Sequence, residues 1–161
     1  MKKIITLMLS LLMVLALVAC SSDKENSTGN NSEELSAFAK GLQEKADPRY
    51  NICTEADTTV VKQSGNYVFF FMYSAQELDV DDNNWGETYS KAFLDNVSLN
   101  DCEKIANEII NSSLEDMNLV GMEVSEGFLN GFSMEVTGFK SGYVFSPMIG
   151  AIPFIAYVFE I

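Results

Sequence analysis

One segment of the chain, residues 67–73, constrains the fold more than any other. Its sequence is Tyr-Val-Phe-Phe-Phe-Met-Tyr, so both alternating faces of an extended segment would be apolar. Successive side chains of a strand point to opposite faces of a sheet, and a strand that is apolar on both faces needs cover on both. The segment therefore predicts a central strand, with an aromatic ligand pocket as the alternative.

Two further strands are expected around this one. The residues Ser64-Gly65 are typical of a turn, and they predict a hairpin that pairs residues 58–62 with residues 66–75. Near the C-terminus, residues 154–159 are aromatic, β-branched and uncharged. That composition favours a buried terminal strand over a membrane-spanning segment, which would need about 20 apolar residues. An exposed apolar hairpin that grips a partner is the other alternative for the uncharged residues 143–159.

Three helices are expected from apolar residues that recur with a period near 3.6. The first is predicted over residues 32–46, with Ser32 as its N-cap, and a short second one over residues 87–95. The third is predicted over residues 99–117, with a capping box that begins at Ser98.

The period changes to two from residue 119 onwards. Residues 132–136 alternate apolar and polar side chains, which predicts a strand with one solvated face. Asn130-Gly131 is a strong signal for a two-residue hairpin turn. We therefore expect two similar strands, residues 122–128 and 134–139, on either side of this turn.

Together these patterns predict an α+β domain over residues 33–161. It should contain an antiparallel sheet of about four to six strands, packed on one face by two or three helices. Apolar residues make up 47% of the chain, which is enough for a single core.

Residues 1–19 are typical of a secretory signal peptide, since two lysines precede an uncharged apolar run. The run ends in Leu17-Val18-Ala19-Cys20, which resembles the bacterial lipobox. The resemblance implies that Cys20 receives a diacylglyceryl group and becomes the first residue after cleavage. It also implies a lipid anchor, palmitate included, and a place on the extracytoplasmic face of the cell membrane.

Residues 20–32 are polar after the cysteine and predict a flexible tether. The order of tether, amphipathic helix, aromatic strand, second helix and terminal strand is similar to small lipoproteins of Gram-positive bacteria. This resemblance implies the class and the location of the protein. It implies no catalytic residue and no cofactor.

The chain is strongly acidic, with a formal net charge of -13, and removal of Lys2 and Lys3 with the signal peptide changes this to -15. Such a charge repels phosphate backbones, so a nucleic-acid partner is not expected. Cationic peptides, basic proteins and divalent ions suit the charge better. Solubility is the alternative explanation of the charge.

The chain contains no histidine. This excludes Ser-His-Asp and Cys-His nucleophiles and every His-ligated metal site. We therefore expect a membrane-anchored, non-enzymatic binding or accessory module with a protein or peptide partner. The alternatives are a lipoprotein that binds a small ligand or a cation such as calcium, and a carboxylate-dependent hydrolase.

An acidic loop, residues 76–87, provides candidates for two kinds of site. Calcium prefers closely spaced oxygen ligands. The first three positions of an EF-hand loop would be Asp79, Asp81 and Asn83. However, Asn84 stands where this loop requires glycine, and Ser90 stands where it requires glutamate. The loop also holds Trp85, a candidate anchor for a partner if its side chain is exposed.

Two cysteines remain once Cys20 is lipidated. Outside the cell, Cys53 and Cys102 are candidates for a disulfide that would close a loop of about 50 residues and stabilise the domain by about 4 kcal/mol. Cys102 lies on the apolar face of a predicted helix, so a buried, unreactive thiol is the alternative.

Overall fold

The computed structural model describes residues 34–49, 55–80, 83–112, 117–148 and 154–161. The chain divides into two compact units, Met1–Ser32 and Glu33–Ile161, and every described residue belongs to the second. The predicted signal peptide, Cys20 and the tether lie outside the described residues. Within the described ranges, no helix is long and apolar enough to cross a membrane.

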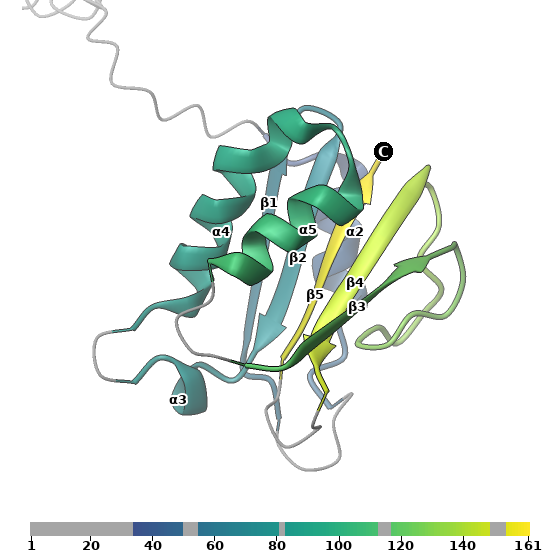
Figure 1. Ribbon diagram of the computed structural model, residues 1–161. Helices are drawn as coiled ribbons and strands as arrows, with labels where there is room; N and C mark the ends of the chain where they lie inside the picture. The colour runs from purple at the N-terminus through teal and green to yellow at the C-terminus, as the bar shows by residue number, and fades with distance from the viewer. Residues whose placement is uncertain (1–33, 50–54, 81–82, 113–116, 149–153) are drawn as a thin grey trace, which may run out of the picture. The chain divides into compact units, whose positions relative to one another are not determined.

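The unit is built around one antiparallel sheet with five described strands, which confirms the α+β class and the expected number of strands (Figure 1). The order across the sheet is β1-β2-β5-β4-β3, so β1 and β3 form its edges. The strands are β1 (Thr58–Ser64), β2 (Tyr67–Tyr73), β3 (Leu119–Val124), β4 (Ser141–Pro147) and β5 (Phe154–Glu160).

The aromatic segment is a central strand, as its sequence predicts. All seven residues of β2 are buried, and the strand pairs with β1 on one side and β5 on the other. The hairpin between β1 and β2 is confirmed as well, and its turn contains Gly65 with a φ of 55°. Few residues other than glycine adopt a positive φ without strain.

Side chains of β2 alternate between two cores, one on each face of the sheet. Phe69 and Phe71 pack with α4 (Trp85–Asn96) and α5 (Cys102–Asn111) on the first face. Phe70 packs on the second face with α2 (Ala37–Lys45). The described helices, expected on one face only, therefore lie on both. Because both faces of β2 are apolar, both must be covered from water, and a helix layer on one face alone would leave the other exposed.

Both cores consist of residues of the Glu33–Ile161 unit. This unit therefore contains the apolar packing on which its own folding depends. Two short elements complete it, α3 (Ala75–Leu78) and the 3₁₀ helix η1 (Val97–Leu99).

Two helices begin later than predicted. Helix α2 begins at Ala37, because Ser36 caps it by accepting a hydrogen bond from Ala39 N at 3.2 Å. Ser32, the expected cap, lies outside the described residues. Helix α5 is capped by Asp101, and Ser98 belongs to η1 instead.

Helix α5 also ends earlier than predicted, at Asn111. The hydroxyl of Ser112 donates to the carbonyl of Ile109 at 2.6 Å. Serine side chains compete in this way with the helical backbone, which explains why the helix stops here.

The hairpin predicted at Asn130-Gly131 forms only in part: the turn is present, but the two flanking strands are not. A turn does lie there, with Gly131 at a φ of 88°, but β3 pairs with β4, and the turn belongs to their long connection. This connection lies against the end of α2, where Ser133 N donates to Lys45 O at 2.8 Å. Residues 132–136 form no strand, and Phe132 and Val136 enter the second core, while Met134 remains 51% exposed. Across the turn, Gly127 and Val136 form a single antiparallel bridge, with N–H to O distances of 3.0 and 2.8 Å, and the longer ladder expected between residues 122–128 and 134–139 does not form.

Candidate functional site

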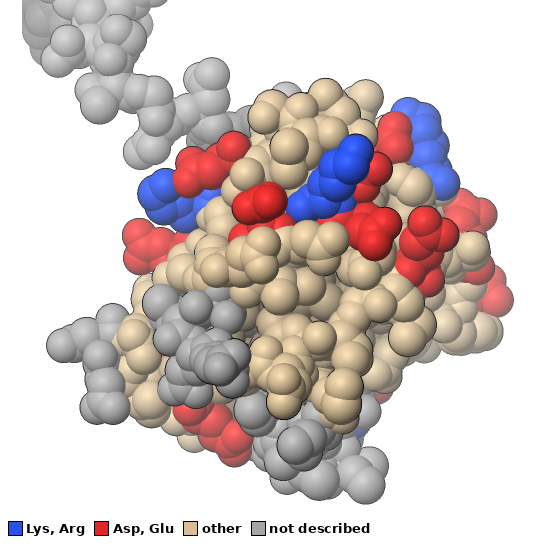
Figure 2. Space-filling view, in the orientation of Figure 1, with Lys and Arg blue, Asp and Glu red and all other residues tan. Residues whose placement is uncertain are grey.

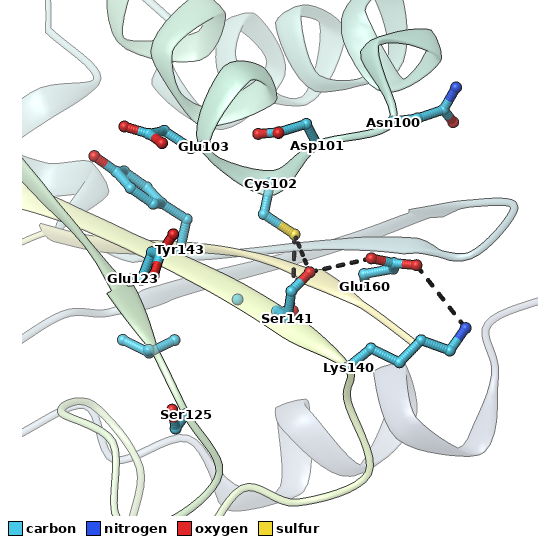
Figure 3. A pocket seen from close by; sticks show the side chains of 12 residues that line it. Asn100, Asp101, Cys102, Glu103, Glu123, Ser125, Lys140, Ser141, Tyr143 and Glu160 are labelled. Atoms are coloured by element: carbon cyan, nitrogen blue, oxygen red, sulfur yellow. Dashed lines mark hydrogen bonds and ion pairs between the residues drawn. The ribbon is translucent and has the colours of Figure 1, made fainter.

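A cleft of about 350 Å³ opens where α5 begins, beside the ends of β3, β4 and β5 (Figure 3). Its lining consists of residues 100–103, 123–125, 140–143 and Glu160. Four of these residues are acidic and one is basic. They are Asp101, Glu103, Glu123 and Glu160 against Lys140. The cleft therefore carries an excess of negative charge.

The surface around the cleft has the same character. Figure 2 shows this face of the molecule, on which acidic side chains outnumber basic ones and gather over α5 and beside β3. Charges of one sign that line a concave surface reinforce one another and attract ions of opposite sign.

The start of α5 places two of the acidic groups. Asn100 adopts a left-handed conformation with a φ of 51°, which turns the chain from η1 into the helix. The carboxylate of Asp101 then accepts a hydrogen bond from Lys104 N at 2.9 Å and caps α5. Glu103 follows in the first turn, where the partial positive charge of a helix N-terminus stabilises a carboxylate.

Polar contacts link the floor of the cleft to its rim. The hydroxyl of Ser141 donates to a carboxylate oxygen of Glu160 at 3.1 Å and lies 3.4 Å from the sulfur of Cys102. The other carboxylate oxygen of Glu160 lies 3.9 Å from Lys140 Nζ. Figure 3 shows these four side chains converging from α5, β4, β5 and the residue before β4.

The thiol of Cys102 is not activated by these neighbours. Burial raises its pKa and is the largest influence; the hydrogen bond with Ser141 lowers the pKa by less, and the nearby carboxylates of Glu160 and Asp101 raise it. A thiol with a raised pKa stays protonated at neutral pH, and the thiolate is the nucleophilic form. Cys102 is therefore a structural residue of the cleft.

Tyr143 forms another wall of the cleft and lies close against β3. A Cβ atom added to Gly121 would lie 2.4 Å from Cε1 of the tyrosine, so only glycine leaves room for the ring. Burial raises the pKa of the Tyr143 phenol, and the negative charges of Glu103 and Glu123 raise it further. The phenol is therefore neutral and borders two carboxylates.

The expectation of an exposed Trp85 is wrong. Its side chain is 1% exposed, and its ring packs against Tyr89 and Phe154 at centroid distances of 5.3 and 6.2 Å. Trp85 is the first residue of α4 and belongs to the core between this helix and the sheet. It is a packing residue, and it has no surface to offer a partner.

The calcium candidates are placed only in part. Asp79 uses one carboxylate oxygen to accept from Trp85 N at 2.7 Å and the other to accept from Tyr73 Oη at 2.9 Å. The backbone N–H of Asn83 donates to Val80 O at 3.0 Å, and Asp81 lies outside the described residues. In the described part of the chain, no three acidic or cysteine side chains are grouped to hold a metal ion. Asp79 instead ties the loop to the start of α4.

The predicted disulfide is not tested, because Cys53 lies outside the described residues. Cys102 is buried, and its sulfur lies 3.4 Å from the Ser141 hydroxyl. The bridge remains a prediction.

Sequence reasoning did not find the cleft. Its carboxylates come from α5, β3 and β5, which are far apart in the sequence, and no short motif contains them. Asp101 is the last residue of the capping-box pattern that begins at Ser98, and this pattern indicates the start of a helix rather than a site. Helix capping and strand pairing, rather than spacing along the chain, bring these groups together.

The fold and the cleft define a class: an α+β domain with a five-stranded antiparallel sheet and a carboxylate-lined cleft at the start of a helix. No family model, curated protein or solved structure matches the chain.

Proposed function

We propose that the protein is a membrane-anchored, extracytoplasmic lipoprotein whose domain is a non-enzymatic module that binds a cationic protein or peptide. The observation that carries this proposal is the cleft at the start of α5, with four carboxylates and one lysine in its lining. The lipobox at Cys20 supports the anchor and the location.

The charge of the whole chain favours the same kind of partner. The net charge of -13, which becomes -15 when residues 1–19 are removed, attracts basic partners over a distance and speeds their association. The carboxylates of the cleft then provide the site at which such a partner binds. The attraction is screened by salt over about 10 Å at an ionic strength of 0.1 M.

The residues of the cleft suit recognition better than chemistry. The chain offers no histidine as a general base, and burial raises the pKa of the Cys102 thiol. Lys140 Nζ lies 3.9 Å from a carboxylate oxygen of Glu160, and the lysine neutralises part of the charge of that carboxylate. The groups that remain accessible, Glu103 and Glu123, are well placed to form ion pairs with lysine or arginine side chains.

We expect the double substitution Glu103→Gln/Glu123→Gln to weaken binding of a cationic peptide about tenfold, because it removes two ion pairs worth about 0.5–1 kcal/mol each. A suitable probe is a fluorescein-labelled heptapeptide in which valine and lysine alternate. Fluorescence anisotropy with residues 21–161 measures its dissociation constant at two salt concentrations. Affinity and its salt dependence should both fall in the variant.

The matched control for this experiment is Glu44→Gln/Glu55→Gln, which removes the same charge from exposed residues outside the cleft. This control should change the affinity less than about twofold, because exposed charges at a distance are screened. Equal losses in the two double variants would show that only net charge matters and would overturn the proposed site.

The anchor has its own test. Metabolic labelling of producing cells with a fatty acid should label the wild-type protein, and Cys20→Ala should remove the label and release the domain from membranes. Label retained by the Cys20→Ala variant would contradict the lipid anchor. The binding experiment above would be unaffected by that outcome.

A further inference from the structure

The two edge strands of the sheet are not equivalent. Edge strands expose unpaired backbone groups that can add another strand, and proteins commonly protect them with lysine, proline or a covering segment. Strand β1 carries Lys62, and the chain that leads into α2 lies against it, with Ser36 N donating to Gln63 Oε1 at 2.8 Å. Strand β3 contains neither lysine nor proline, and among the described residues nothing pairs with its outer side.

The register of β3 with β4 shows which backbone groups point outward. In an antiparallel pair, residues bonded to the partner alternate with residues whose N–H and C=O groups face away. Met148 N donates to Asn118 O at 2.9 Å, and this bond continues the β3–β4 register. The outward-facing residues are therefore the odd-numbered ones, Leu119, Gly121 and Glu123. Pro147, which has no N–H, stands opposite the first of them, as this alternation requires.

The two faces of this edge differ in chemistry. The odd-numbered side chains lie on the α5 face, where Leu119 packs against the first core and Glu123 lines the acidic cleft. The even-numbered side chains lie on the opposite face. There Val120 and Met122 are 38% and 61% exposed.

We propose that the outer edge of β3 binds an extended segment of a partner protein as a sixth, antiparallel strand, with basic side chains on the α5 face and apolar side chains on the other. Backbone bonds to Leu119, Gly121 and Glu123 provide affinity, as in other cases of strand addition. A lysine or arginine opposite Glu123 lies at the cleft, between that carboxylate and Glu103. Alternate residues of the segment cover Val120 and Met122. This inference rests on the proposed function and specifies how the cationic partner binds.

Charge decides between a different protein and a second copy of this chain. Two copies joined through β3 would bring together two clefts, each with four carboxylates and one lysine. Each copy also carries a net charge of -15 once residues 1–19 are removed, so the pair would repel. A segment with alternating basic and apolar residues places basic side chains beside the carboxylates and apolar ones against Val120 and Met122, without charge repulsion.

Hydrogen exchange followed by NMR tests the strand directly. In the free protein, residues 21–161, the amides of Val120 and Met122 should be protected by β4, and those of Gly121 and Glu123 should exchange quickly. Saturation with the valine–lysine heptapeptide should slow exchange at Gly121 and Glu123 by at least about tenfold, since each gains a hydrogen bond. Little change is expected at Val120 and Met122.

Two modified peptides make the test sharper. When the lysine side chains face α5, the lysine backbone N–H groups point at β3. Methylation of the lysine backbone nitrogens should weaken binding at least about tenfold, and methylation of the valine nitrogens should change it less than about twofold. Equal effects of the two modifications would overturn the sixth strand.

The outcomes separate this inference from the proposed function. Binding that depends on Glu103 and Glu123 but leaves exchange at Gly121 unchanged would overturn the strand and leave the cationic site in place. Absence of any binding by the peptide would overturn both. Protection at Gly121 that rises with protein concentration when no peptide is present would assign the edge to a second copy and overturn the proposal.

Discussion

Replacement of Trp85 by alanine is expected to lower the free energy of unfolding by about 3–5 kcal/mol. The side chain is 1% exposed and packs between Tyr89 of α4 and Phe154 of β5. Its removal leaves a cavity that these rigid aromatic neighbours cannot fill. Urea denaturation followed by circular dichroism measures the change, because the variant has no tryptophan left to report by fluorescence.

The control for this prediction is Leu94→Ala on the same helix. Leu94 is 47% exposed, so its truncation should cost no more than about 1 kcal/mol. If Trp85→Ala were as mild as Leu94→Ala, the tryptophan would have to lie at the surface, where the sequence first suggested it. Loss of stability on the predicted scale would instead place it in the core.

The second large effect is expected at Asp79. Asp79→Ala should lower the free energy of unfolding by about 2–4 kcal/mol, because Trp85 N and Tyr73 Oη both lose their acceptor in a partly buried site. Asp79→Asn retains one side-chain oxygen and should cost about half as much. Equal, small effects of both substitutions would show that the carboxylate does not hold the loop against α4.

Alkaline titration gives an independent measure of the same contact. Burial raises the pKa of Tyr73 to about 12, and the hydrogen bond and charge of Asp79 contribute in the same direction. The folded state therefore holds this proton more tightly than the unfolded state, in which the pKa is near 10.0. The resulting stability is complete below pH 10 and is lost as the pH rises towards 12. Tyr73→Phe should flatten that part of the pH profile, and an unchanged profile would contradict the contact.

The parts of the fold that the sequence predicted correctly are those fixed by burial on both sides. Strands β2 and β5 contain almost nothing but apolar side chains, and only a position at the centre of the sheet buries both faces of such a strand. The spacing of apolar residues could also have predicted that Trp85 is buried in the core. It begins a stripe with Tyr89, Ala92 and Phe93, spaced at four, seven and eight residues, and the buried face of α4 is this stripe. The acidic residues before it obscured that pattern.

The parts that the sequence did not predict depend on competition between distant segments. Asn130-Gly131 forms a turn, but α2 leaves an apolar area on the second face of the sheet, and Phe132 and Val136 cover it. The local sequence Asn130-Gly131 contains no information about this apolar area, which is formed by distant segments of the chain. The same holds for the cleft, in which Glu103 and Glu123 meet only because β3 pairs beside α5.

The most direct test of cationic recognition at the cleft is the map of amide chemical shifts during a titration of residues 21–161 with the valine–lysine heptapeptide. We expect the changes to gather at residues 100–103, 121–125 and 140–143, and to disappear with a heptapeptide in which glutamate replaces lysine. Changes that gather instead in the groove between α4 and α5, around Lys91 and Glu108, or an absence of changes at peptide concentrations that saturate the anisotropy, would contradict it.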